Sequence, residues 1–274
     1  MSANNFVTER NHVILLVPFL YAFFSRMRRL RAFGFNAVTL WGPGLLLTTL
    51  LLDDFSVAAV SCYFAGYFVF ISVYELGYLM NDTWGLRHDE TPRRRIDVDY
   101  SPTFLVLFVA IRLVTVLSLG FWVNTLSSLW FWALLGLLVL AILAHNLVVR
   151  QEFKMATFFQ MSLMRFSIPV FIATAMEEGA IVILIGCLFF VFPRFLTYLD
   201  SKNRLRIPER KQPGFLLVIY AVFAPVVLLI SVSTGETLML FAWAYFMTYA
   251  SLLFAGRHLP FVEKVIGRNA DGGA

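Results

Sequence analysis

Apolar residues along this chain form long continuous runs that short polar stretches separate. Each of eight runs approaches the roughly 20 residues that a helix needs to cross the hydrocarbon core of a bilayer. Because the runs are continuous rather than alternating, they predict helices and not the strands of a barrel. We therefore expect an all-α, polytopic membrane helical bundle whose spans cover residues 36–53, 56–80, 102–123, 126–149, 155–175, 179–199, 214–233 and 236–256.

The composition agrees with a lipid environment. Hydrophobic residues make up 59% of the 274 residues and charged residues 14%, whereas soluble domains carry about 25% charged residues. The lipid bilayer is therefore the expected surrounding of the chain, and we expect no nucleic-acid partner. Cys62 and Cys187 lie inside apolar runs without paired spacing, which indicates buried thiols rather than a disulfide or a zinc site.

A shorter apolar run, VILLVPFLYAFF, precedes the first span and is followed by the basic stretch SRMRRLR. It is shorter than a typical span, so we predict an interfacial helix, with a ninth span as the alternative. The expected fold is one membrane-embedded domain, 1–274, with eight or nine transmembrane helices around a central cavity. Its parts are an interfacial helix and basic linker (1–34), the bundle (35–256) and a cytoplasmic tail (257–274).

Positive charge alternates along the connections between the predicted spans. Every second connection is rich in Lys and Arg, and the intervening ones contain none. By the positive-inside rule the basic connections are cytoplasmic, as in a protein of the bacterial inner membrane. Two of them, 81–101 and 200–213, are long and polar, and an even number of spans separates them. Long loops in compact proteins are often functional, so we expect the active-site loops to share the cytoplasmic face.

Polar residues gather where the second predicted span ends. Glu75, Tyr78 and Asp82 are spaced to share one helix face, and Asn81 and Asp89 lie close by in sequence. Carboxylate and amide oxygens suit Mg²⁺, and the arginines of the following TPRRR stretch suit phosphate oxygens. The pattern indicates either a magnesium–phosphate site or acids and arginines that pair at the membrane surface.

The stretch GYLMNDTWGLRHDETPRRR resembles the first signature of the UbiA superfamily of intramembrane prenyltransferases, Asn-Asp-x-x-Asp-x-x-x-Asp. Asn81, Asp82 and Asp89 match its first, second and last positions, and Gly85 stands where the third acid is expected. The resemblance implies that the three matching residues hold Mg²⁺ on the diphosphate of an isoprenoid donor. It also implies that Asp82 and Asp89 are catalytic, and Glu90 or Glu75 is a candidate replacement for the missing acid.

The second long loop, within PRFLTYLDSKNRLRIPERK, follows the sixth predicted span. The family carries a second pair of acids there, whereas this chain has Asp200 among basic residues. This arrangement resembles the branch that transfers a phosphoribosyl group to polyprenyl phosphate. The two resemblances together imply that Asp200 is catalytic and that the substrate-binding residues are Asn81, Arg93, Arg94, Lys154, Arg165, Arg194, Tyr198, Lys202 and Arg204.

Three functions follow from the resemblance. The first is a transferase that moves a prenyl group, with Mg²⁺, from an isoprenyl diphosphate to an aromatic or lipid acceptor. The second is phosphoribosyl transfer to a polyprenyl phosphate. The third, favoured by Gly85, is a catalytically impaired homologue that binds a lipid phosphate. A transporter is disfavoured because the polar residues concentrate at one face.

Two arginines, Arg112 and Arg165, lie inside predicted spans. A charge within a span is expensive unless it faces a partner or a cavity. Each is therefore expected either to pair with a buried acid, or to bind a phosphate at the wall of the cavity.

Overall fold

The structure is a computed structural model that describes residues 12–84, 96, 100–148, 150–212 and 214–258. All regular structure in these ranges is helical. Eight helices are long and apolar enough to cross a membrane, so the chain is an integral membrane protein and the predicted fold class is confirmed. These helices are Leu30–Leu51, Val57–Thr83, Pro102–Trp122, Leu129–Leu147, Glu152–Thr174, Gly179–Ser201, Gly214–Thr234 and Leu238–Gly256.

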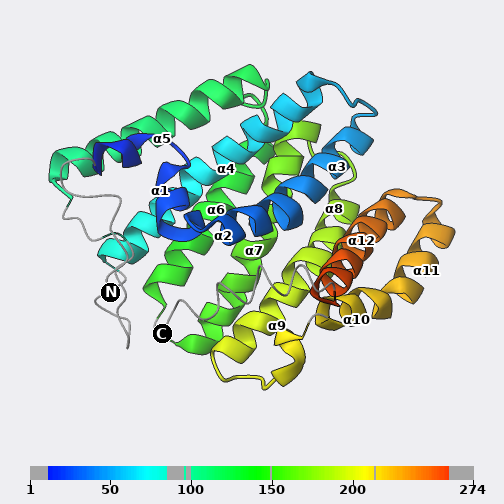
Figure 1. The fold of residues 1–274 in the computed structure, drawn as a ribbon. Helices are drawn as coiled ribbons and strands as arrows, with labels where there is room; N and C mark the ends of the chain where they lie inside the picture. The colour runs from blue at the N-terminus through cyan, green and yellow to red at the C-terminus, as the bar shows by residue number, and fades with distance from the viewer. Residues whose placement is uncertain (1–11, 85–95, 97–99, 149, 213, 259–274) are drawn as a thin grey trace. The chain divides into compact units, whose positions relative to one another are not determined.

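The chain divides into two compact units, Met1–Val182 and Ile183–Ala274. The elements of the first unit are η1 (His12–Leu16), α1 (Leu20–Ala22), η2 (Phe23–Met27), α2 (Leu30–Asn36), η3 (Ala37–Trp41), α3 (Gly42–Leu51), α4 (Val57–Thr83), α5 (Pro102–Trp122), α6 (Leu129–Leu147), α7 (Gln151–Thr174) and the start of α8 (Gly179–Ile185). Figure 1 shows α4 running through the middle of these helices.

The second unit contains the end of α8, η5 (Gly186–Val191), α9 (Phe192–Ser201), η6 (Pro208–Lys211), α10 (Gly214–Val222), α11 (Ala224–Thr234) and α12 (Leu238–His258). Its core is aromatic. The Tyr220 hydroxyl donates to the Phe189 carbonyl at 3.1 Å, and the Trp243 indole N–H donates to the Tyr220 carbonyl at 2.9 Å. These bonds tie α10 to η5 and to α12.

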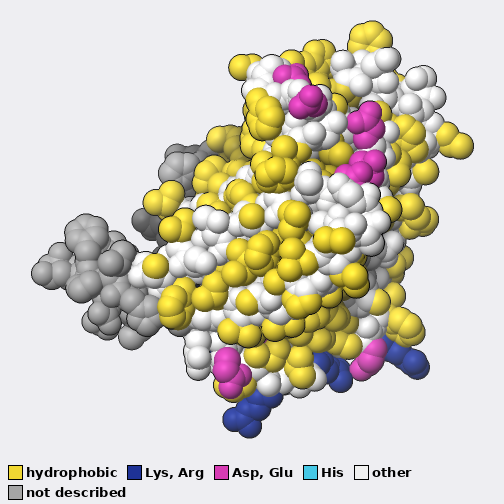
Figure 2. Space-filling model, turned by 90° about the vertical axis from the view of Figure 1, so that its right-hand side faces the viewer, with side chains coloured by type: hydrophobic (Ala, Val, Ile, Leu, Met, Phe, Trp, Pro, Cys, Tyr) yellow, Lys and Arg dark blue, Asp and Glu magenta, His cyan; other side chains and the backbone are white. Residues whose placement is uncertain are grey.

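The outward surfaces of the helices suit lipid. Val106, Leu113 and Phe121 of α5 are all exposed. On the face that Figure 2 shows, hydrophobic side chains cover most of the helical surface and charged side chains gather toward its ends. A lipid bilayer is the environment in which such a surface is stable.

Helix α4 begins with an N-cap at Ser56, whose side chain accepts from the N–H groups of Ala58 and Ala59. Farther along, Gly66 faces the carbonyl of Pro169 in α7, and a Cβ atom at Gly66 would lie 2.5 Å from that oxygen. Small residues let membrane helices approach closely. This approach fixes α4 against α7, and with it the positions of the polar residues that both helices carry.

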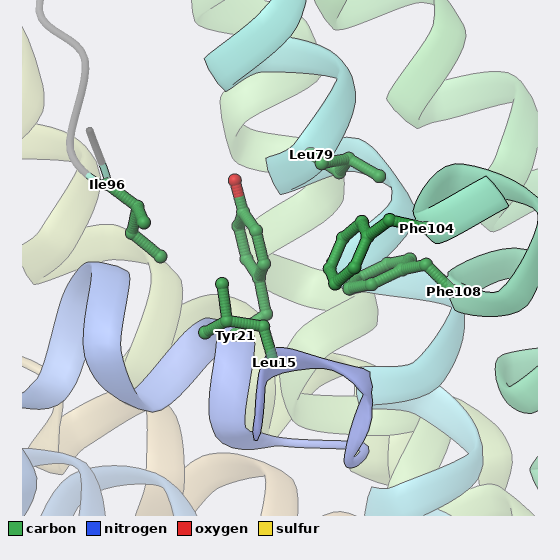
Figure 3. Packing of buried hydrophobic residues seen from close by; sticks show 6 residues of the cluster. All are labelled: Leu15, Tyr21, Leu79, Ile96, Phe104 and Phe108. Atoms are coloured by element: carbon green, nitrogen blue, oxygen red, sulfur yellow. The ribbon is translucent and has the colours of Figure 1, made fainter. Parts of the chain in front are cut away.

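The segment from His12 to Met27, called the N-terminal segment below, is broken into short turns rather than forming the single helix expected from its sequence. It consists of η1, α1 and the wide turn η2, and its bend places Phe19 in the left-handed region at φ 79°. Leu15 and Tyr21 pack with Leu79 of α4 and with Phe104 and Phe108 of α5, as Figure 3 shows. The N-terminal segment is not one of the eight candidate spans, and its place at the bilayer interface stays a prediction.

All but one of the span boundaries lie within three residues of those expected, and two of the differences lie next to the polar residues. The first spanning helix begins at Leu30 rather than at 36, because the chain continues through η3 despite the charge of Arg31 and the small residue Gly34. Helix α4 runs on to Thr83, so Asn81 and Asp82 lie on a helix and not in the predicted loop 81–101. Fixed helical geometry therefore sets the direction of the Asp82 side chain.

We expect Gly66→Ala to destabilise the protein, because the added methyl group would collide with the Pro169 backbone, which cannot rotate away. Overpacking of this kind typically costs about 1–3 kcal/mol. Thermal unfolding in detergent, followed by circular dichroism, measures the effect. Gly136→Ala in α6 is the matched control, because a Cβ atom there meets nothing within 4 Å. Equal unfolding midpoints for the two variants would contradict the close packing of α4 on α7.

Candidate functional site

Two acids on one face of α4, Glu75 and Asp82, point toward the N-terminal segment. They are separated by two helical turns, which puts them above one another. Both are buried, with Glu75 0% and Asp82 1% exposed. A buried carboxylate needs partners, and each of these two has a different set.

Glu75 forms a buried ion pair with Arg112 of α5. Arg112 Nη2 lies 2.7 Å from Glu75 Oε2, and the other Glu75 oxygen accepts from the Ala22 N–H at 2.7 Å. Arg112 also donates to the backbone carbonyls of Leu15 and Leu16. The pair therefore holds the N-terminal segment on both sides of its bend at Phe19, and the expectation that Arg112 pairs with a buried acid is confirmed.

Asp82 accepts three hydrogen bonds from side chains. The Tyr21 hydroxyl donates to Oδ2 at 3.1 Å, and Arg26 Nη2 and Asn81 Nδ2 donate to Oδ1 at 3.3 and 3.4 Å. Burial, together with the charge of Asp82, raises the pKa of Tyr21, so its phenol stays protonated and continues to donate. Both oxygens of the carboxylate are thus occupied by donors from within the chain.

This arrangement does not fit Mg²⁺. A metal ion would need the oxygens that Tyr21 and Arg26 occupy, and the Arg26 guanidinium would repel it. Over the described ranges, no group of three His, Cys, Asp or Glu side chains is placed to hold a metal ion. Asp89, the other expected acidic ligand, lies outside the described residues, as do Arg93 and Arg94.

Arg165 of α7 differs from Arg112 in its partners. Its Nη2 donates to Asn36 Oδ1 at 2.8 Å, and its buried Nε has no hydrogen-bond partner. It makes no ion pair with any carboxylate in the part of the chain that the structure describes. Arg165 is thus a half-buried cation within a span whose described polar neighbours, Asn36 and the tyrosines of α4, are all uncharged.

Other donors without an acceptor lie beside Arg165. Within the described ranges the Trp41 indole N–H and the Tyr67 hydroxyl are buried and form no hydrogen bond of good geometry, and their rings meet edge to face at 5.6 Å. The Tyr67 oxygen lies toward both Trp41 and Arg165 and can accept from one of them. Tyr67, Tyr74 and Tyr78 of α4 lie within electrostatic range of Arg165. Buried polar groups are normally satisfied, so several unused donors in one place call for a missing acceptor.

The remaining predicted residues lie in α7 and in the second unit. Lys154 is half-buried near the start of α7. In the second unit, Asp200 pairs with Arg210 and accepts from the Ile207 N–H at 2.9 Å. These contacts stabilise the loop that follows α9. The other predicted residues of that unit are Arg194, which stacks on Phe190 at 4.7 Å, half-buried Tyr198, and exposed Lys202 and Arg204.

Sequence reasoning did not identify Tyr21, Arg26, Asn36, Trp41 or Tyr67 as site residues. Only tertiary packing brings them together, because Arg26 precedes Asp82 by 56 residues and Asn36 precedes Arg165 by 129. Arg26 belongs to a basic run that resembles any cytoplasmic flank of a span. No local motif marks the other four.

Comparison with known proteins gives no match: no family model, no curated protein and no solved structure is similar to this chain.

We expect Glu75→Gln to unfold the N-terminal segment from the bundle, because it leaves Arg112 charged and buried without its partner. Breaking one side of a buried ion pair typically costs about 3–5 kcal/mol. The double variant Glu75→Leu, Arg112→Met removes both charges and should recover part of that loss. Thermal unfolding and proteolysis at the N-terminus measure the changes, with exposed Glu177→Gln as control. A single variant as stable as the control would contradict the role of this pair.

Proposed function

We propose that this protein is a UbiA-like membrane protein that binds the phosphate group of an isoprenoid lipid at Arg165. The supporting observation is a cation within a span that has no carboxylate partner among the described residues. A charge at that depth is costly without a counter-charge, and such residues usually mark ligand sites. An anionic ligand supplies the counter-charge.

The local charges favour an anion. Three arginines, Arg26, Arg112 and Arg165, accompany two carboxylates, Glu75 and Asp82. Among these described groups one positive charge is therefore left over, and it resides at Arg165. A phosphate would accept from the Arg165 guanidinium and also from the Trp41 and Tyr67 donors, which converts three orphan donors into charge-assisted hydrogen bonds.

The rest of the ligand is proposed from the surroundings of the site. The aromatic rings of Phe19, Phe33 and Phe68 lie around Trp41 and Tyr67. A ligand with an anionic head and a long apolar tail matches these aromatic surroundings. Such a ligand would reach the site sideways from the bilayer. Isoprenyl diphosphate and polyprenyl phosphate share this chemistry. We further propose a bacterial inner membrane location with the basic loops in the cytoplasm, on the charge pattern of the connections.

Group transfer, of a prenyl or a phosphoribosyl group, is the second candidate function. The observation that favours it is the adjacent pair Asn81 and Asp82 at the end of α4, which matches the start of the UbiA signature. In the described arrangement the Asp82 carboxylate is engaged by Arg26 and Tyr21, so this activity requires the two side chains to move away.

Binding is tested with a fluorescent polyprenyl phosphate and with the polyprenol of the same length, using protein in nanodiscs. We expect saturable binding of the phosphate only, and Arg165→Gln should weaken it at least about tenfold, since a charge-assisted hydrogen bond contributes about 1.5–3 kcal/mol. Arg31→Gln, at an exposed arginine of α2, is the matched control for net charge. Equal binding of phosphate and polyprenol, or by Arg165→Gln and the unaltered protein, would refute the proposal.

Turnover is tested with an isoprenyl diphosphate or phosphoribosyl diphosphate as donor, with and without Mg²⁺. We expect no turnover from the unaltered protein, because Arg26 and Tyr21 occupy Asp82 and Gly85 supplies no further acid. Magnesium-dependent product formation that Asp82→Ala abolishes would instead establish the second candidate function. Gly85→Asp, which restores the family signature, indicates whether the missing acid limits activity.

A further inference from the structure

We infer that Asp82 is a positioning residue for Arg26 rather than a metal ligand, and that Arg26 is a second phosphate-binding cation of the Arg165 site. The inference rests on the proposed lipid-phosphate binding and names the group that completes it. Asp82 belongs to a sequence motif typical of magnesium sites, but its carboxylate is surrounded by hydrogen-bond donors.

Arg26 is held with part of its binding capacity unused. Its Nη2 pairs with Asp82 at 3.3 Å, its Nη1 contacts the Ser25 carbonyl at 3.4 Å, and its Cζ lies 4.5 Å from the centre of the Tyr78 ring. Within the described residues these hydrogen bonds use two of the five N–H donors of a guanidinium group. The side chain is 14% exposed. Donors of this kind remain available to an incoming phosphate.

The backbone of the N-terminal segment does not depend on Asp82. Glu75 holds the Ala22 N–H, and Arg112 holds the Leu15 and Leu16 carbonyls. Within the described part of the N-terminal segment, the hydrogen bonds of Asp82 go to the ends of the Tyr21 and Arg26 side chains and to no backbone group. Its carboxylate therefore directs the Arg26 guanidinium within a segment that other residues already fix.

Tyr78 relates Arg26 to Arg165. The Arg26 guanidinium lies over its ring, and Arg165 lies within electrostatic range of the same tyrosine. The N-terminal segment also borders the orphan donors directly, because the Phe19 ring contacts Trp41 at 6.1 Å and Tyr67 at 6.3 Å between centroids. Two cations and two neutral donors thus lie along one stretch of α4 and the N-terminal segment, where the described carboxylates are Asp82 and Glu75, and Glu75 is already paired with Arg112.

A double-mutant cycle on Arg26 and Asp82 tests the inference, with a fluorescent polyprenyl phosphate as probe. We expect Arg26→Gln to weaken binding about tenfold, as for loss of one charge-assisted hydrogen bond, with partial recovery in Arg26→Lys. Asp82→Asn should weaken binding about three- to tenfold while Arg26 is present, because the guanidinium loses its fixed position. In the Arg26→Gln background, Asp82→Asn should cause no further weakening.

Chelation of divalent ions should leave the affinity of the unaltered protein unchanged. Competition by inorganic phosphate separates recognition of the head group alone from recognition of the whole lipid, and thermal unfolding verifies that each variant is folded. Binding by Arg26→Gln that equals the unaltered protein would overturn the inference while leaving the proposed function intact. So would an Asp82→Asn effect of the same size in both backgrounds, or binding that needs Mg²⁺. A complete lack of binding by the unaltered protein would overturn both.

Discussion

Hydrocarbon cannot solvate a charge, and this constraint organises the first unit of the structure. The Glu75–Arg112 pair satisfies it completely, because each group bonds to the other and to the backbone of the N-terminal segment. The N-terminal segment is not a continuous helix, so some of its carbonyl and N–H groups have no partner within the segment. It can lie beside α4 and α5 because Glu75 and Arg112 bond to these groups. The same constraint indicates a ligand at Arg165, since no described carboxylate forms an ion pair with it.

The pattern of apolar runs was sufficient to predict the spanning helices. Continuous hydrophobicity is a strong signal, and every span boundary except the start of the first helix lies within three residues of the predicted one. The first helix can include Arg31 because the long side chain of an arginine near a helix end can place its charge at the membrane–water interface. The extension of α4 is more consequential, since it turns Asn81 and Asp82 from loop residues into helix residues with fixed directions.

The candidate site was predictable only in part. Arg165 was identified because a charge inside a span stands out, and Asp82 because it follows a recognisable spacing. The side chains that determine what Asp82 does, Tyr21 and Arg26, come from a segment whose sequence resembles an ordinary basic flank. Spacing along the chain reports local geometry, whereas hydrogen bonds to distant segments depend on packing that no single helix encodes.

The Glu75–Arg112 ion pair also constrains the order in which segments can fold during synthesis. Glu75 and Arg112 are 37 residues apart, and at the usual speed of synthesis, about 5–20 residues per second, the arginine follows the glutamate by roughly two to seven seconds. During that interval α4 carries an acid whose partner does not yet exist, and the N-terminal segment has no docking place. The N-terminal segment therefore cannot reach its final position before α5 has been synthesised.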